Sequence, residues 1–154
     1  DICCNPMRIS HDAADPVAYR FAHGRKKAAI VTDLGNYNDY TVESLKGMDA
    51  LLLEANHDIN MLQVGPYPYY LKQRILGDKG HLSNERAGQL LTRLIHDDLQ
   101  AVLLGHLSKE NNMPELAYEA VRVEMTMADE GIAVRDLPMQ VARRNEVTPV
   151  IHIA

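Results

Sequence analysis

Several residue types that often reveal a protein's class are scarce in this chain of 154 residues. It has no tryptophan, one phenylalanine and only two cysteines, the neighbours Cys3 and Cys4. Adjacent cysteines are poorly placed to form an ordinary disulfide with each other. No signal peptide is recognisable, and no apolar run approaches the roughly 18 residues that a membrane-spanning helix needs. The sequence therefore predicts a soluble, cytoplasmic protein.

The chain also has fewer basic than acidic residues. Lys and Arg number 16 against 21 Asp and Glu, which gives a formal net charge of −5 and an isoelectric point near 5.8. This charge argues against a protein that holds nucleic acid through its overall field, but it allows a nuclease whose metal ions supply a local positive field. The first residue is Asp1 rather than Met. We expect either that an upstream segment was removed or that this is a piece of a longer polypeptide.

Length and pattern predict one domain over residues 1–154. The 46% of hydrophobic residues can form a sizeable core. Short apolar runs between turn residues predict strands at 7–10, 17–22, 28–32, 50–54, 101–104, 139–142 and 147–153. Helical spacing predicts helices at 38–46, 58–64 and 69–76, one after an N-cap at Ser83, and one from Pro114 to Ala128 that ends at Gly131. Strands alternating with helices indicate an α/β fold with a mixed sheet.

A six-residue phrase occurs twice in the chain. Gly-His-Leu-Ser-x-Glu stands at residues 80–85 and again at 105–110. Each copy places an imidazole after a glycine and before a serine that can cap a helix, which is a way to fix a ring at the rim of a site. The repeat predicts that His81 and His106 are presented in a functional site.

Four predicted strands end in residues that can bind a metal. The side chains that follow these apolar runs include His11, Asp33, Glu54 with nearby His57, and His106. Loops at strand ends converge on one edge of an α/β sheet, where such proteins build their sites. Imidazole and carboxylate suit a hard divalent ion, and no cysteine lies near enough for a structural thiolate zinc site.

Each of these residues also has a simpler interpretation. A histidine in a chain with seven of them is more often structural than a ligand, and Asp33 precedes Gly35 as in many turns. Glu54 and His57 could cap a helix that begins near residue 58. We assign three histidines to surface or structural roles: His23, His96 and His152. Pattern alone leaves both interpretations open for the strand-end residues.

Five longer segments resemble a known family. Residues 9–19, 31–35, 53–58, 71–85 and 104–112 are similar, in order, to the second half of the YycJ (WalJ) group of metallo-β-lactamase-fold hydrolases. The resemblance runs over about residues 8–123 and is most distinctive at 71–85. It implies half of an αβ/βα sandwich, a mixed sheet with flanking helices. The His-x-His-x-Asp-His motif of the family's first half does not occur in this sequence.

The resemblance implies a role for each matching residue. In the complete fold, two divalent metal ions, zinc or manganese, lie between the sheets. His11 matches the histidine that completes one metal's shell, Asp33 the carboxylate that bridges both metals, and His106 the late histidine that binds the other. His81 resembles the histidine that faces the scissile phosphate in the related RNase Z enzymes and acts as proton donor.

Substrate contacts are less firmly indicated. His57 resembles a ligand only weakly, and we expect it either behind the metal ligands, supporting them, or on the substrate side of the site. Cations near the same loops could hold substrate phosphates, although a role as solvated surface charge is equally compatible. These cations are Lys72, Arg74, Lys79 and Lys109.

The resemblance implies a metal-dependent hydrolase of phosphodiester bonds, specifically a nuclease similar to a DNA exonuclease, present as an incomplete fragment. Its expected partners are the missing N-terminal half of the fold or a second copy of this chain, and a nucleic acid or small phosphodiester, with no membrane. One alternative is a non-catalytic half-domain that binds metal or a partner and self-associates. Another is a flavodoxin-like domain for a small ligand, against which the absence of a glycine-rich phosphate loop after the first strand counts.

Overall fold

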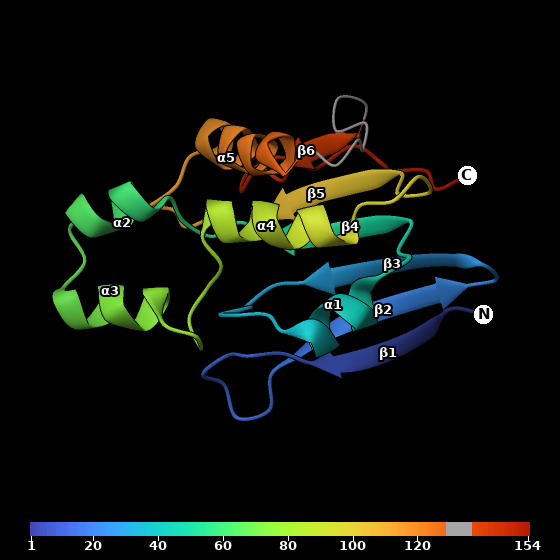
Figure 1. The fold of residues 1–154 in the computed structure, drawn as a ribbon, viewed down its shortest axis with the longest axis horizontal. Coiled ribbons are helices and arrows are strands. Elements are labelled where there is room, and N and C mark those ends of the chain that lie inside the picture. Colours follow the sequence, from blue (N-terminus) through green and yellow to red (C-terminus); the bar gives the residue numbers. More distant parts are fainter. Residues whose placement is uncertain (129–136) are drawn as a thin grey trace.

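A single mixed sheet organises the chain in the computed structural model, which describes residues 1–128 and 137–154 (Figure 1). The six strands lie across the sheet in chain order. They are β1 (Cys3–Arg8), β2 (Val17–His23), β3 (Lys26–Val31), β4 (Ala50–Glu54), β5 (Ala101–Gly105) and β6 (Met139–Val141). The first three strands form an antiparallel meander, and β3 to β6 run parallel. The predicted α/β class and mixed sheet are confirmed.

Helices cover one face of this sheet. The described helices are α1 (Asp39–Leu45), α2 (Ile59–Val64), α3 (Tyr69–Leu76), α4 (Asn84–Leu94) and α5 (Pro114–Met127). In Figure 1, α1, α4 and α5 lie in front of the sheet, whereas α2 and α3 project beyond the end of the sheet at which the arrowheads of β3 and β5 lie. Buried side chains of α1, α4 and α5 join those of the strands in one hydrophobic core. The site described below lies at the same end of the sheet as α2 and α3.

Helix α4 forms as its sequence predicts. Ser83 is the N-cap, and its side chain accepts a hydrogen bond from the Arg86 amide. Leu90, Leu91 and Leu94 repeat at helical spacing and are buried. A Cβ at Gly88 would lie 2.6 Å from the Cβ of Glu124, so the glycine allows close packing of α4 on α5.

Two predicted features differ from the structure. The strand at 147–153 is wrong: that segment has no regular structure and pairs with no described strand, and Val147 and Val150 are 97% and 81% exposed. Its end is held instead by hydrogen bonds between Gln100 and Ala154. The first strand begins earlier than predicted, at Cys3, because it pairs with all but the end of β2. The predicted helix end at Gly131 lies outside the described residues.

The sheet face opposite the helices carries an apolar row. Tyr19 pairs with Ile30, Ile30 with Leu52, and Leu52 with Leu103, so these four side chains lie side by side across four strands. Tyr19 and Ile30 are 43% and 42% exposed, and the two leucines are partly exposed. Within the described part of the chain, no helix covers this row.

Candidate metal centre

The strand-end residues meet at one edge of the sheet. The ends of the parallel strands β3, β4 and β5 lie together, and they deliver Asp33, Glu54 and His106. The Asp33 Oδ1 atom is 3.7 Å from His11 Nε2, 3.7 Å from His106 Nε2 and 3.8 Å from His81 Nδ1. The predicted convergence of His11, Asp33 and His106 is therefore confirmed, and His81 joins them.

The backbone is unusual at two of these positions. Asp33 and His106 both have φ of +57°, and they are the only non-glycine residues with positive φ in the described ranges. This left-handed conformation is costly for such residues and is often found at functional sites. Two hydrogen bonds stabilise the turns: the Asn56 side chain donates to the His106 carbonyl at 2.8 Å, and the Leu34 amide donates to Glu54 Oε2 at 2.6 Å.

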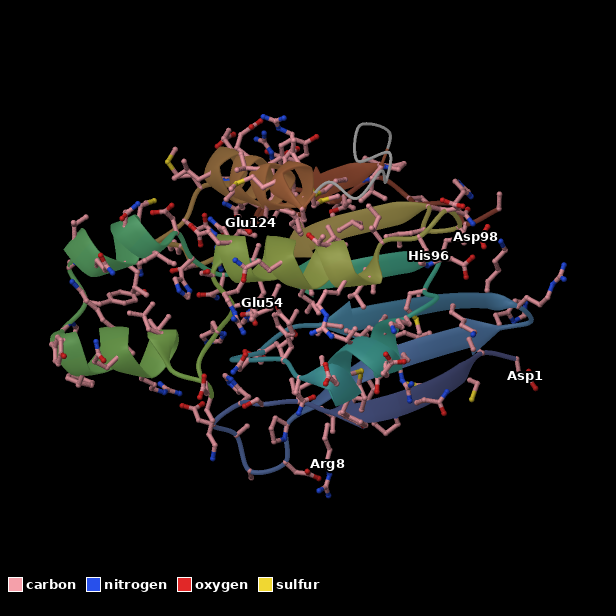
Figure 2. The ribbon with its side chains drawn as sticks, in the orientation of Figure 1. Asp1, Arg8, Glu54, His96, Asp98 and Glu124 are labelled. Atoms are coloured by element: carbon pink, nitrogen blue, oxygen red, sulfur yellow. The ribbon has the colours of Figure 1, made fainter. Side chains whose placement is uncertain are left out.

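Glu54 lies at the centre of the cluster, inside the molecule at the end of β4 (Figure 2). Its Oε1 atom accepts hydrogen bonds from Nδ1 of His81 and Nδ1 of His106, both at 2.7 Å. Burial raises the pKa of Glu54, but the hydrogen bonds from His106 and His81 outweigh it and hold the pKa below its usual range. An ionised carboxylate can only accept, so each Nδ1 carries the proton and each Nε2 keeps a free lone pair. The bond to Glu54 also raises the pKa of His106.

His11 is oriented in the same way by a backbone carbonyl. Its Nδ1 lies 3.0 Å from the Gly80 oxygen, which can only accept, so Nε2 again keeps its lone pair. The three rings stand in a series: the centroids of His11 and His81 are 5.1 Å apart, and those of His81 and His106 are 5.4 Å apart. Three imidazoles thus present nitrogen atoms next to one carboxylate.

The loop that carries His81 is held by close backbone contacts. A Cβ at Gly80 would overlap the carbonyl oxygens of Ile75 and Arg74. A Cβ at Gly35 would lie only 2.5 Å from the Asp78 carbonyl oxygen. Only glycine fits at either position without a backbone shift. The predicted turn at Asp33–Gly35 thus packs directly against the loop that carries His81 and helps to fix its position.

This set of donors fits a divalent metal ion. Asp33, Glu54, His81 and His106 each offer a ligand atom, and these atoms lie within 4.8 Å of one another. Imidazole nitrogen and carboxylate oxygen are the ligands of zinc and similar ions. All the hydrogen bonds of Glu54 come from N–H donors, so its geometry suits orienting the histidines rather than binding the ion.

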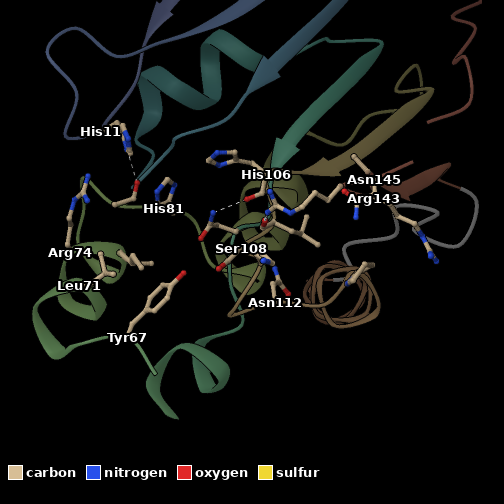
Figure 3. A pocket seen from close by; sticks show the side chains of 18 of the residues that line it. His11, Tyr67, Leu71, Arg74, His81, His106, Ser108, Asn112, Arg143 and Asn145 are labelled. Atoms are coloured by element: carbon tan, nitrogen blue, oxygen red, sulfur yellow. Dashed lines mark hydrogen bonds between the residues drawn. The ribbon is translucent and has the colours of Figure 1, made fainter. Parts of the chain in front are cut away.

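A cavity of about 920 Å³ opens next to the cluster (Figure 3). His11, His81 and His106 form part of its wall. The remaining wall includes residues from α3 and its approach, from the loop after β5, and from the segment after β6. Those that matter below are Tyr67, Leu71, Arg74, Ile75, Lys109, Arg143 and Arg144.

Only some of the predicted substrate-side residues line the cavity. Arg74 and Lys109 line the cavity, but Arg74 is paired with Asp12, and this hydrogen bond lowers the pKa of the Asp12 carboxyl. Lys72 does not line it, and its Nζ donates to the Gln63 carbonyl at 2.7 Å. Arg143 and Arg144, which the sequence interpretation missed, add cations to the wall.

His57 lies below the surface rather than on the substrate side. It is 1% exposed, is not among the cavity residues, and its Nδ1 has no hydrogen-bond partner in the described structure. Burial lowers its pKa to about 4, so the ring is neutral. Direct contact with a substrate is therefore ruled out in this conformation. Nor does it cap α2: the N-cap is Asp58, whose side chain accepts from the Met61 amide.

Two of the histidines assigned to structural roles make ordinary backbone contacts. His96 Nε2 lies 3.0 Å from the Met48 oxygen, and His23 Nδ1 lies 3.0 Å from the Asp1 oxygen. The sequence analysis names Glu54 among the strand-end residues but does not predict that it orients two histidines. Its signal was present, because a lone carboxylate ends the otherwise apolar strand Ala50–Glu54.

Comparison with solved structures identifies the fold. The metallo-β-lactamase-fold protein YhfI from Bacillus subtilis superposes with a TM-score of 0.62 at 14% identity, over 92% of this chain and 46% of that one. The chain therefore has about half of a metallo-β-lactamase fold. No family model matches the sequence. In the described ranges, none of the helices combines the length and apolar character that a bilayer crossing requires.

Sequence relatives then confirm the predicted resemblance to the WalJ/YycJ group. The exodeoxyribonuclease WalJ of Streptococcus pneumoniae serotype 2 is 39% identical over 153 residues, which make up 99% of this chain and 56% of the relative. The exodeoxyribonuclease YycJ of Bacillus anthracis is 40% identical over 134 residues, or 87% of this chain and 50% of the relative. The chain thus spans about half the length of the curated relatives it matches.

Proposed function

We propose that this chain supplies one half of the active site of a metal-dependent nuclease that hydrolyses phosphodiester bonds in DNA. The observation that carries the proposal is the convergence of Asp33 with three histidines, two of them oriented by the buried Glu54. The names of the two relatives, both exodeoxyribonucleases, support DNA as the substrate.

His11, Asp33 and His106 are the proposed metal ligands. The Nε2 atoms of His11 and His106 both lie 3.7 Å from Asp33 Oδ1, and the second Asp33 oxygen allows the carboxylate to bridge two ions. The proposed cofactors are two divalent ions, zinc or manganese. When bound, such ions lower the pKa of water and neutralise charge on the phosphate.

His81 is the proposed proton donor. Its Nδ1–H donates to Glu54 Oε1, which fixes the ring and leaves Nε2 as the nitrogen that can give a proton to the departing alkoxide. Lys109, Arg143 and Arg144 are suited to hold the flanking phosphates, because they line the cavity. Arg74 can do so only in competition with Asp12.

A second half of the fold would complete the site. The apolar row of Tyr19, Ile30, Leu52 and Leu103 is left uncovered by the described residues, and monomers rarely expose large apolar patches. We therefore propose that residues 1–154 are the C-terminal half of one domain. The missing N-terminal half, or failing that a second copy of this chain, would pack on this face and bring the remaining metal ligands.

The two histidines of the repeated phrase provide the test. In the complete gene product, His106→Ala should lower metal content and nuclease activity together, because one ligand is lost. His81→Ala should keep the metal and slow DNA hydrolysis by about 10²- to 10⁴-fold. The loss should be smaller for a nitrophenyl phosphodiester, whose leaving group needs no proton. His152→Ala, an exposed histidine in the C-terminal tail, is the matched control.

Metal analysis and kinetics on both substrates decide the outcome. Metal loss in His81→Ala, or full activity and metal in His106→Ala, would show that the roles are assigned wrongly. Absence of any hydrolysis by the metal-loaded wild type would overturn the proposed function itself.

A further inference from the structure

Helix α3 takes no part in the hydrophobic core, so its position depends on polar contacts. The helix projects beyond the end of the sheet (Figure 1), has no buried residue and adds no side chain to the core cluster. Packing of an apolar face is what normally fixes a helix in a folded protein. Each polar contact between α3 and the rest of the chain therefore has more influence than usual on where the helix lies.

Two consecutive side chains after β1 hold the loop that follows α3. The Ser10 hydroxyl donates to the Asp78 carbonyl at 2.7 Å. The Nδ1 atom of His11 lies 3.0 Å from the Gly80 carbonyl oxygen. The segment that presents the proposed metal ligand His11 is thus bonded to the loop that leads to His81, although the bonded residues are 68 and 69 positions apart.

The next residue, Asp12, holds the helix itself. Its carboxylate accepts hydrogen bonds from Nε and Nη2 of Arg74, the second at 3.1 Å. A guanidinium that donates two N–H bonds to one carboxylate fixes direction as well as distance. In Figure 3, Arg74 points from α3 toward the loop that carries His11. Because the Arg74 side chain is 62% exposed, the pair should affect the position of α3 more than the stability of the whole chain.

The last turn of α3 also fixes the backbone of His81. The His81 amide donates to the Ile75 carbonyl at 3.0 Å, and Ile75 follows Arg74 directly in the chain. Both residues line the cavity, as do Leu71 and Tyr67. A shift of α3 would therefore move the backbone of the proposed proton donor and the wall of the cavity together.

We propose that Asp12 and Arg74 are positioning residues for the proton donor His81. The inference rests on the proposed nuclease function, in which His81 gives a proton to the departing alkoxide. Glu54 anchors the ring at Nδ1 alone, so the place of Nε2 depends on the backbone of His81 as well. A proton donor must lie within hydrogen-bond reach of the atom that it protonates, and a misplacement of about 1 Å can cost about 10²-fold in rate.

Kinetics of the complete, metal-loaded gene product on DNA and on a nitrophenyl phosphodiester test the proposal. Arg74→Gln should lower kcat for DNA by about 10-fold or more with KM nearly unchanged, and should alter kcat for the nitrophenyl ester by less than about twofold, since its leaving group needs no proton. Asp12→Asn, which keeps one accepting oxygen in place of two, should do the same. In the His81→Ala background, Arg74→Gln should cause no further loss, because both changes act on one proton transfer.

Hydrogen exchange gives a second measurement that does not depend on activity. Arg74→Gln should speed exchange of the His81 amide and of the α3 amides, while α4 exchanges as in the wild type. Arg93→Gln is the matched control, because it removes another surface arginine, which pairs with Asp39 at 2.9 Å and links α4 to α1. It should leave the kinetics and the exchange of α3 unchanged.

The outcomes separate this inference from the proposed function. A higher KM for DNA in Arg74→Gln at unchanged kcat, with a lower KM in Asp12→Asn, would make Arg74 a phosphate contact and overturn the positioning role. Equal losses on both substrates, metal loss in Asp12→Asn alone, or unchanged exchange at His81 would also overturn it. Full kcat in both variants, beside the expected loss in His81→Ala, would refute the positioning role while the nuclease proposal stands. Absence of hydrolysis by the metal-loaded wild type would refute the nuclease proposal and this inference with it.

Discussion

Replacing Glu54 by glutamine tests the centre of the site while keeping the shape of the side chain. The carboxylate accepts two N–H groups at Oε1, from His81 and His106, and one at Oε2, from the Leu34 amide. A glutamine has one accepting oxygen and an NH₂ group that can only donate. Either orientation of the amide therefore leaves at least one N–H group facing another donor in the interior.

The size of the effect follows from these contacts. If the amide oxygen faces the histidines, the Leu34 N–H is left without an acceptor, which costs about 1–3 kcal/mol of unfolding free energy. If it faces Leu34, both histidines lose their anchor. Loss of such an orienting partner typically weakens metal binding by about 10- to 100-fold. The pKa of His106 should also fall, because its hydrogen bond to Glu54 is the main cause of its elevation.

Metal affinity and stability are the quantities to measure. Competition with a chromogenic chelator gives the affinity of the complete gene product for zinc, and urea denaturation of the metal-free protein gives stability. Glu43→Gln makes the same chemical change on the exposed surface of α1, where Glu43 pairs with Lys46, and serves as control. If Glu54→Gln binds zinc within about threefold of wild type and is as stable as Glu43→Gln, the orienting role of Glu54 is refuted.

Two further predictions concern the surroundings of the site. Burial lowers the pKa of His57 from 6.5 to about 4, so the unfolded chain takes up this proton first as pH falls, and unfolding free energy should decrease between about pH 6.5 and 4, with about 2 kcal/mol lost at pH 5. Urea titrations at pH 7 and 5 should show a smaller loss in His57→Gln, and an equal loss would contradict the assignment. Gly80→Ala should destabilise the protein by about 1–3 kcal/mol and lower activity, because its Cβ would overlap the Ile75 carbonyl. Gly77→Ala, whose Cβ would stay 3.2 Å from the nearest carbonyl oxygen, should cost less in the same denaturation assay.

Much of the fold was predictable because its local signals agree with its tertiary contacts. The strand Ala50–Glu54 and the helix Tyr69–Leu76 have the predicted bounds, since turn residues delimit both. The segment at 147–153 alternates in the same way but has no neighbouring strand, and a strand cannot form without a partner to accept its hydrogen bonds. Pairing across the sheet is a property of the whole chain, so local pattern could not exclude this strand.

The site was predictable to the extent that it follows strand ends. His11, Asp33 and His106 come directly after apolar runs, and parallel strands bring such positions together. The burial of His57 was not predictable, because it depends on how the loop after β4 folds under the cluster. Glu54 was recognised as a strand-end residue, but its orienting role was not predictable for a related reason: the role lies in hydrogen bonds to residues 27 and 52 positions away.

The hydrogen bonds of His81 and His106 to Glu54 give a structural reason for the repeated six-residue phrase. Both copies place the Nδ1 of a histidine 2.7 Å from the same oxygen of Glu54, yet their surroundings differ. Ser83 of the first copy caps α4, whereas Ser108 of the second accepts from the Asn111 amide in a turn. The anchored nitrogen is thus equivalent in the two rings, and the opposite nitrogen is free to serve a different purpose in each. One buried carboxylate can in this way orient the proposed metal ligand and the proposed proton donor together.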